Sequence, residues 1–222
     1  MTILKITDLS IAYKKHTVLE NINLEMSPGE CLGLMAPSGT GKTTLINAIA
    51  GILPESAACH GSMVFAGQEL VGNPQLHRRL QGTALSLLPQ QPVASLFPLA
   101  TIGQQLYHVQ KAHGATDKGM AQKQAAGVLS NLGINDPQRI MDAYPCQISG
   151  GQAQRICLAM CLLQKPRLLL ADEPTASLDT QAQEDELEQL QLLRKLSSAT
   201  ALLIASHNRA LLEKIATRIV TI

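Results

Sequence analysis

A glycine-rich segment between a short apolar run and a helical pattern constrains this chain more than any other feature. Residues 31–35 read Cys-Leu-Gly-Leu-Met, an apolar run of strand length. The loop after it reads Ala-Pro-Ser-Gly-Thr-Gly-Lys-Thr, and residues 44–52 repeat apolar side chains at helical spacing. In this order, small residues let successive backbone N–H groups turn toward a polyphosphate, and the helix N-terminus adds partial positive charge. We therefore expect a phosphate-binding loop (P-loop) between a buried strand and a helix.

The residue types in this loop match specific roles. Lys42 is expected to reach the outer phosphates, and the Thr43 hydroxyl to ligate Mg²⁺. The strict pattern begins with glycine, and Ala36 stands there instead, which is acceptable if φ at that position is negative. The alternative is an ordinary turn before a helix. The residues expected at the phosphates are Ala36, Pro37, Ser38, Gly39, Thr40, Gly41, Lys42, Thr43 and Thr44.

A second apolar run ends in two carboxylates. Residues 168–171 read Leu-Leu-Leu-Ala, and Asp172 and Glu173 follow. Runs of this length, also present at residues 3–6 and 201–205, suit strands of a sheet that is buried on both faces. Ligands bind at the carboxyl ends of such strands. We expect Asp172 to hold Mg²⁺ and Glu173 to polarise an attacking water, although a solvated strand exit would read the same way.

The composition of the chain argues against several classes of protein. The 222 residues are 45% hydrophobic and 16% charged, enough for one domain or for one core with an inserted lobe. A net charge of +1 gives no electrostatic footprint for nucleic acid, and three Tyr and two Phe without Trp argue against base stacking. No apolar run approaches the ~18 residues that a membrane span needs. Five cysteines without a C-x-x-C pair favour reduced thiols in a cytosolic protein.

The middle of the chain has a different pattern. Between about residues 92 and 144 there is little strand signal, and residues 122–132 read as a helix that Gly133 ends. We interpret this part as a mostly helical lobe inserted into an α/β core. Further helices are expected at residues 183–196 and 211–216.

A second glycine pair follows this lobe. Residues 148–152 read Ile-Ser-Gly-Gly-Gln and precede an apolar helical run. Adjacent glycines with a serine at a helix start form an anion-binding nest. One nucleotide needs only one cradle, so the second nest is expected to serve a nucleotide that another copy holds.

Together these motifs resemble those of the ATP-binding subunits of ABC transporters. The resemblance covers nearly the whole chain, and the family signature Leu-Ser-Gly-Gly-Gln differs here only at Ile148. It implies the ABC ATPase fold: an α/β P-loop NTPase core with a mainly parallel sheet, an N-terminal antiparallel β part and an inserted helical lobe. The expected boundaries are residues 1–91 and 146–222 for the core and 92–145 for the lobe. The implied cofactors are ATP and Mg²⁺.

The resemblance also assigns further site residues. Tyr13 stands where the family places an aromatic ring against adenine, and the alternative is a core tyrosine. Gln90 occupies the Q-loop, where the family glutamine meets Mg²⁺ and water, with Gln91 as the alternative. His207 matches the switch histidine that contacts the γ-phosphate, so the implied catalytic set is Glu173, His207 and Gln90. The implied signature and D-loop contacts to nucleotide are Ser149, Gly150, Gly151, Gln152 and Asp179.

The implied activity is ATP hydrolysis that powers transport. The family forms head-to-tail dimers, here of two identical chains or of paralogues, with ATP between the P-loop of one copy and the signature of the other. The implied partners are transmembrane permease subunits and, indirectly, a solute-binding protein, without nucleic acid. This places the chain at the cytoplasmic face of the inner membrane as a peripheral subunit. Residues 90–103 resemble dipeptide, oligopeptide and nickel import ATPases, with Phe97 replacing an Asn, which favours an importer of peptides, nickel or metal chelates.

Other functions share parts of this pattern. An ATPase of an exporter or of a lipoprotein-release system would carry the same motifs. DNA-repair and chromosome-structure ATPases need a long coiled coil, which is missing here, and a translation factor of the superfamily carries two cassettes. A simple P-loop kinase would not need the signature sequence or His207. After His207 only fifteen residues follow, for which we expect one helix, one strand and no regulatory domain.

Overall fold

The computed structural model describes most of the chain. Two expected site residues, Ser38 and Asp179, lie outside the described residues, as does part of the helix expected at 183–196, whose described residues are helical. The described ranges are 2–14, 16–37, 39–174, 187–188, 190–192, 194–195 and 198–222.

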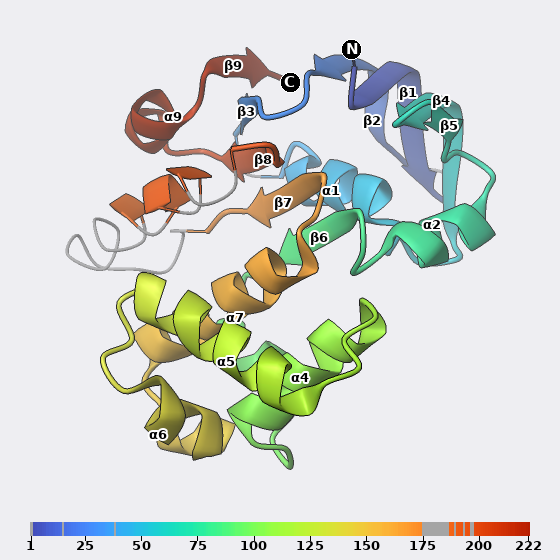
Figure 1. Ribbon diagram of the computed structural model, residues 1–222. Helices are drawn as coiled ribbons and strands as arrows, with labels where there is room; N and C mark the ends of the chain where they lie inside the picture. Colours follow the sequence, from blue (N-terminus) through green and yellow to red (C-terminus); the bar gives the residue numbers. More distant parts are fainter. Residues whose placement is uncertain are drawn as a thin grey trace.

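An antiparallel sheet forms the N-terminal part, with strand order β2-β1-β4-β5 (Figure 1). The strand expected at residues 3–6 is the start of a ten-residue strand, and Asp8 at a φ of 48° lies where its register shifts. The shift keeps Leu4, Ile6, Leu9 and Ile11 all buried. The strands are β1 (Leu4–Tyr13), β2 (His16–Met26), β4 (Ala57–Phe65) and β5 (Gln68–Glu69).

A parallel sheet with strand order β6-β7-β8-β3-β9 forms the centre of the molecule. Its three middle strands lie where the apolar runs predict them, and β7 and β8 are buried along their whole length. This confirms the predicted α/β fold with a mainly parallel sheet and an antiparallel β part. The strands are β3 (Cys31–Met35), β6 (Leu85–Leu88), β7 (Leu168–Asp172), β8 (Ala201–Ser206) and β9 (Arg218–Thr221).

The parallel sheet separates two hydrophobic cores. Consecutive strand residues point to opposite faces, so Leu168 and Leu170 pack in the core that contains the helix after the P-loop and the antiparallel sheet. Leu169 and Ala171 pack in the other core, with the helices of the middle of the chain. Because β3, β7 and β8 run parallel, their carboxyl ends emerge together at one edge of the sheet.

Helices cover both faces of the parallel sheet and form a separate layer. In Figure 1, α4, α5 and α6 lie at the bottom of the view, away from the antiparallel sheet. After His207, α9 and β9 are the expected helix and strand. No helix in the described ranges is both long and apolar enough to cross a membrane. The helices are α1 (Lys42–Ala50), α2 (Pro74–Leu80), α3 (Pro92–Ser95), α4 (Ile102–Ala112), α5 (Lys118–Asn131), α6 (Pro137–Asp142), α7 (Gly150–Gln164) and α9 (Arg209–Ile215).

Candidate active site

The P-loop joins the end of β3 to the start of α1, as the sequence predicts. Gly39 and Gly41 adopt φ values of 83° and 96°, a region that glycine enters without strain. Ala36 is not among the non-glycine residues that the described chain holds at positive φ, and it is buried. The condition for a methyl group at that position is therefore met.

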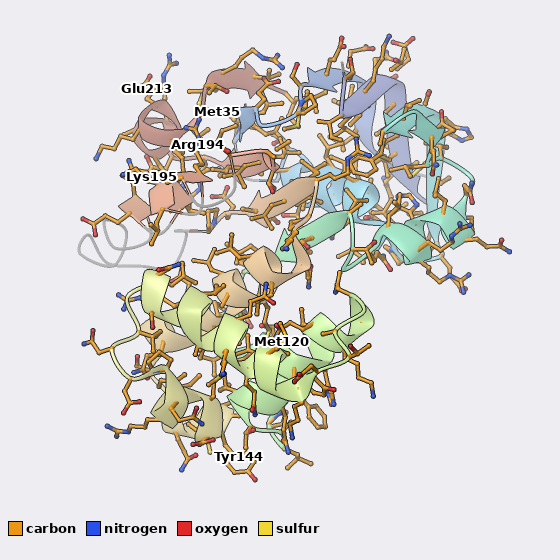
Figure 2. All side chains as sticks on the ribbon, in the orientation of Figure 1. Met35, Met120, Tyr144, Arg194, Lys195 and Glu213 are labelled. Carbon is orange, nitrogen blue, oxygen red and sulfur yellow. The ribbon has the colours of Figure 1, made fainter. Side chains whose placement is uncertain are left out.

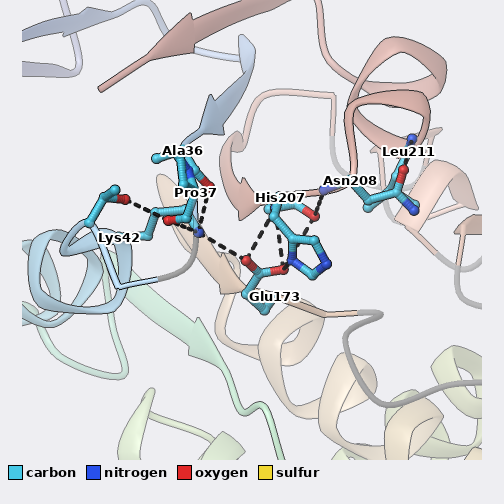
Figure 3. A network of polar contacts seen from close by, with 9 residues as sticks. Ala36, Pro37, Lys42, Glu173, His207, Asn208 and Leu211 are labelled. Carbon is cyan, nitrogen blue, oxygen red and sulfur yellow. Dashed lines mark hydrogen bonds and ion pairs between the residues drawn. The ribbon is translucent and has the colours of Figure 1, made fainter.

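Lys42 connects the P-loop to the end of β7 (Figure 3). Its Nζ atom donates to the carbonyl oxygens of Ala36 at 2.7 Å and Pro37 at 3.0 Å. The same atom forms an ion pair with Glu173 Oε1 at 3.2 Å, and Lys42 is only 5% exposed. An ammonium group has three N–H donors, so each donor of Lys42 has a partner.

The Glu173 carboxylate accepts further hydrogen bonds from the end of β8. The His207 backbone N–H donates to Oε1 at 3.1 Å, and the His207 ring Nδ1 lies 2.8 Å from Oε2. The Ser206 hydroxyl donates to Oε2 at 3.4 Å. Burial alone would raise the pKa of Glu173, but the hydrogen bonds from His207 and Lys42 outweigh it and lower the pKa. Glu173 is therefore held as a carboxylate.

The Glu173 backbone is strained. Its φ is 44°, in the left-handed region that costs an L-residue roughly 1–2 kcal/mol. Its N–H donates to the Ala205 carbonyl oxygen at 2.8 Å, which holds the residue beside β8. Strain of this kind at a residue with a functional side chain supports a role for that side chain.

Asp172 and Thr43 together fit a hard cation. Asp172 is 7% exposed, and the Thr43 hydroxyl forms a hydrogen bond with its side chain. Burial raises the pKa of Asp172, while the Thr43 hydrogen bond lowers it. Asp172 Oδ1 is buried and has no hydrogen-bond partner in the described part of the chain. Oxygen ligands of this type suit Mg²⁺, which usually completes its shell with water and substrate phosphates.

Tyr13 and Gln90 lie at the ends of neighbouring strands. Tyr13 is the partly buried last residue of β1 and pairs with His16 of β2. A Cβ atom placed on Gly41 would lie 2.7 Å from the Leu19 side chain, so β2 passes directly over the P-loop. Gln90 is exposed two residues after β6, the neighbour of β7. The adenine and Q-loop roles of Tyr13 and Gln90 remain predictions.

The signature residues form a helix start that faces solvent. Ser149 is the N-cap of α7: its hydroxyl accepts from the Gln152 N–H at 3.2 Å, and Gln152 Oε1 accepts from the Ser149 N–H at 2.9 Å. A Cβ atom on Gly150 or Gly151 would meet no atom of the described residues within 4 Å, and both glycines are exposed. The packing of the chain itself therefore does not require glycine at these two positions.

Ser206 is a site residue to which the sequence analysis assigned no role. It is fully buried, and its hydroxyl accepts from the Asn208 N–H at 3.0 Å while donating to Glu173. It thus links the Glu173 carboxylate to the start of α9. The only sequence signal is a serine at the end of an apolar run, directly before the predicted site histidine.

Comparison with known proteins identifies the family. Residues 19–176 match the family model described as ABC transporter. The peptidoglycan transport ATP-binding protein YejF of Agrobacterium fabrum is 34% identical over 224 residues, which cover 98% of this chain and 41% of YejF. The metal-staphylopine import system ATP-binding protein CntD of Staphylococcus aureus is 31% identical over 223 residues, which cover 99% of this chain and 82% of CntD.

A solved structure agrees with this assignment. The dimeric structure of MJ0796, a bacterial ABC transporter cassette, superposes with a TM-score of 0.80 at 25% identity, and the match covers 99% of this chain and 94% of MJ0796. The chain belongs to the ABC transporter family. It spans less than half the length of YejF and most of CntD.

The two P-loop glycines allow a matched test of this geometry. Both have positive φ, but only at Gly41 would a Cβ atom clash with Leu19, while at Gly39 it would meet nothing within 4 Å. We expect Gly39→Ala to lower the free energy of unfolding in urea by about 1 kcal/mol. Gly41→Ala should cost about 2–3 kcal/mol, because overpacking adds to the strain. Equal losses would contradict the close approach of β2.

Proposed function

We propose that this chain hydrolyses ATP within a dimer of two such chains or of paralogues, and that hydrolysis powers a membrane transporter. The observation that carries the proposal is the convergence of Lys42, Asp172, Glu173 and His207 at the carboxyl ends of three adjacent strands. Phosphoryl transfer depends mainly on positioning and on charge stabilisation, and these four side chains supply both.

The P-loop, residues 36–44, would hold the phosphates, with Lys42 on the outer ones. Thr43, Asp172 and Gln90 would hold Mg²⁺, which offsets the negative charge of the phosphates when it is bound. The unpartnered Oδ1 of Asp172 supports this arrangement. Tyr13 would stack on adenine, supported by the position of the β1–β2 hairpin over the P-loop.

Glu173 would act as the general base. A proton passes from the attacking water to the Glu173 carboxylate, and the water oxygen bonds to the γ-phosphorus. The bond from that phosphorus to the bridging oxygen breaks, and ADP and phosphate form. His207 has its Nδ1 on Glu173 and a half-exposed ring, so its Nε2 is the nitrogen available to the γ-phosphate.

Ser149, Gly150, Gly151 and Gln152 would bind the nucleotide of the second chain. Packing among the described residues gives no reason for glycine at Gly150 and Gly151, whereas a phosphate group approaching the backbone N–H groups does. The dimeric state of the MJ0796 cassette supports the same arrangement.

The transporter partner would bind the helical lobe. We assign residues 92–145 to the lobe and residues 1–91 and 146–222 to the core. Phe97 and Leu99 are 60% and 80% exposed, and Figure 2 shows Tyr144 at the outer surface of the same layer. Large exposed apolar side chains in one region indicate a protein contact, here with permease subunits at the cytoplasmic face of the inner membrane.

The names of two relatives support a class of transported cargo. CntD belongs to a metal-staphylopine import system, and YejF is a peptidoglycan transport protein. Together with the likeness of residues 90–103 to peptide and nickel import ATPases, this supports an importer of peptides, nickel or metal chelates. Such an importer would receive its cargo from a solute-binding protein, which this chain would meet only indirectly.

Replacing the general base tests the chemistry. Glu173→Gln keeps the shape of the side chain but cannot accept the proton, so phosphate release should fall by roughly 10²–10⁴-fold. ATP binding should persist, and an ATP-stabilised dimer should elute earlier on size exclusion. Glu213→Gln, at an exposed position of α9 on the outer edge of the molecule (Figure 2), is the matched control and should retain activity. Normal turnover by Glu173→Gln would show that Glu173 is not the base.

Mixing two inactive variants tests the head-to-tail dimer. Lys42→Ala damages the P-loop of its own chain, and Gly151→Asp places a negative charge on the signature. A heterodimer of the two carries one intact composite site, so mixing should restore part of the ATPase activity. Absence of recovery in a sample whose heterodimers are verified by two affinity tags would contradict the arrangement.

The transport role is tested by purification from membranes. The tagged chain, expressed with the permease genes of its own locus and extracted in detergent, should co-purify with integral membrane subunits. Phe97→Ser should weaken that association and leave the basal ATPase activity of the isolated chain unchanged. Co-purification with DNA or ribosomes in place of membrane subunits would contradict the transport assignment.

A further inference from the structure

We propose that Lys42 blocks the general base until nucleotide binds. The ammonium group exchanges between Glu173 Oε1 and the nucleotide phosphates, so that nucleotide binding exposes the oxygen that accepts the proton. The inference rests on the proposed function and adds a role for Lys42 beyond phosphate binding. It follows from a count of donors and acceptors in the network of Figure 3.

All three N–H donors of Lys42 already have acceptors. Lys42 has three N–H donors, and these meet the Ala36 carbonyl, the Pro37 carbonyl and Glu173 Oε1 at 2.7, 3.0 and 3.2 Å. The two carbonyl groups belong to the P-loop backbone. A phosphate oxygen can therefore gain a donor from Lys42 only if one of these three acceptors gives it up, and the contact with Glu173 is the longest of the three.

The two oxygens of the Glu173 carboxylate are held differently. Oε2 meets the His207 ring Nδ1 at 2.8 Å and the Ser206 hydroxyl at 3.4 Å, both from the end of β8, and it shares the His207 backbone N–H at 3.4 Å. Oε1 meets Lys42 at 3.2 Å and the His207 backbone N–H at 3.1 Å. When Lys42 turns to a phosphate, Oε2 stays anchored and Oε1 keeps a single donor, which leaves room for a water hydrogen.

The exchange has two consequences for the site. While Lys42 contacts Glu173, Oε1 is blocked and the charge of the buried Lys42 is balanced by the Glu173 carboxylate, so neither group is unpaired. With a phosphate in the cradle, the same charge is balanced by the phosphate and the base is free. Glu173 can then activate water only when a phosphate occupies the P-loop. The Glu173 carboxylate also competes with any bound nucleotide for Lys42.

This competition is measurable with ADP, which occupies the cradle and is not hydrolysed. Glu173→Gln removes the competing charge, and Glu173→Asp keeps the charge but shortens the side chain by one methylene, away from Lys42. We expect both variants to bind ADP roughly tenfold more tightly than the unmodified chain, because a charge-assisted contact no longer has to be broken. Glu213→Gln removes one exposed charge elsewhere and should leave ADP affinity unchanged.

The experiment is isothermal titration of ADP into the full chain with excess EDTA, so that a cation at Asp172 contributes nothing. Thermal unfolding of each variant verifies that it is folded. Tighter ADP binding by both Glu173 variants supports the exchange of Lys42 between Glu173 and the phosphates. Tighter binding by Glu173→Gln alone would indicate general charge repulsion and overturn it, as would unchanged binding by both. If the unmodified chain binds no ADP, the proposed function itself fails, which is a distinct result.

Discussion

The ion pair between Lys42 and Glu173 is the contact on which the site depends, because it joins two motifs that are far apart in the sequence. Lys42 begins α1 after β3, and Glu173 follows β7. The two strands are not direct neighbours: β8 lies between them and supplies Ser206 and His207, which hold the other side of the carboxylate. A change in strand order would separate the donors from the acceptor, so this topology is a condition for the chemistry.

The hydrophobic cores fix that topology. Side chains of β7 and β8 are buried on both faces, and a shift of one residue in either strand would exchange the two sets between the cores. The register pairs Asp172 with Ala205, which sets the heights at which Glu173 and Ser206 leave the sheet. Apolar packing therefore positions the polar groups to within hydrogen-bond distance.

Local patterns predict the central strands of the parallel sheet, and the contacts between elements need the structure. The runs at residues 31–35, 168–171 and 201–205 are strands because short apolar segments of this kind are stable only inside a two-sided sheet. The length of β1 was underestimated because its bulge at Asp8 interrupts the alternation of apolar residues. The Lys42–Glu173 pair has no local signal and Ser206 only a weak one, since both contacts depend on which strands become neighbours in the fold.

The strained backbone at Glu173 explains how two consecutive carboxylates serve one site. In a regular strand, consecutive side chains point to opposite faces of the sheet. Asp172 and Glu173 are consecutive, yet the charge of Lys42 acts on both of them. The φ of 44° ends the extended conformation at Glu173 and turns its side chain toward the P-loop, while the Ala205 carbonyl holds the turned peptide in place. Under the proposed function, the roughly 1–2 kcal/mol cost of the left-handed conformation meets a geometric need, because a cation ligand and a base on adjacent residues would have to face the same phosphate.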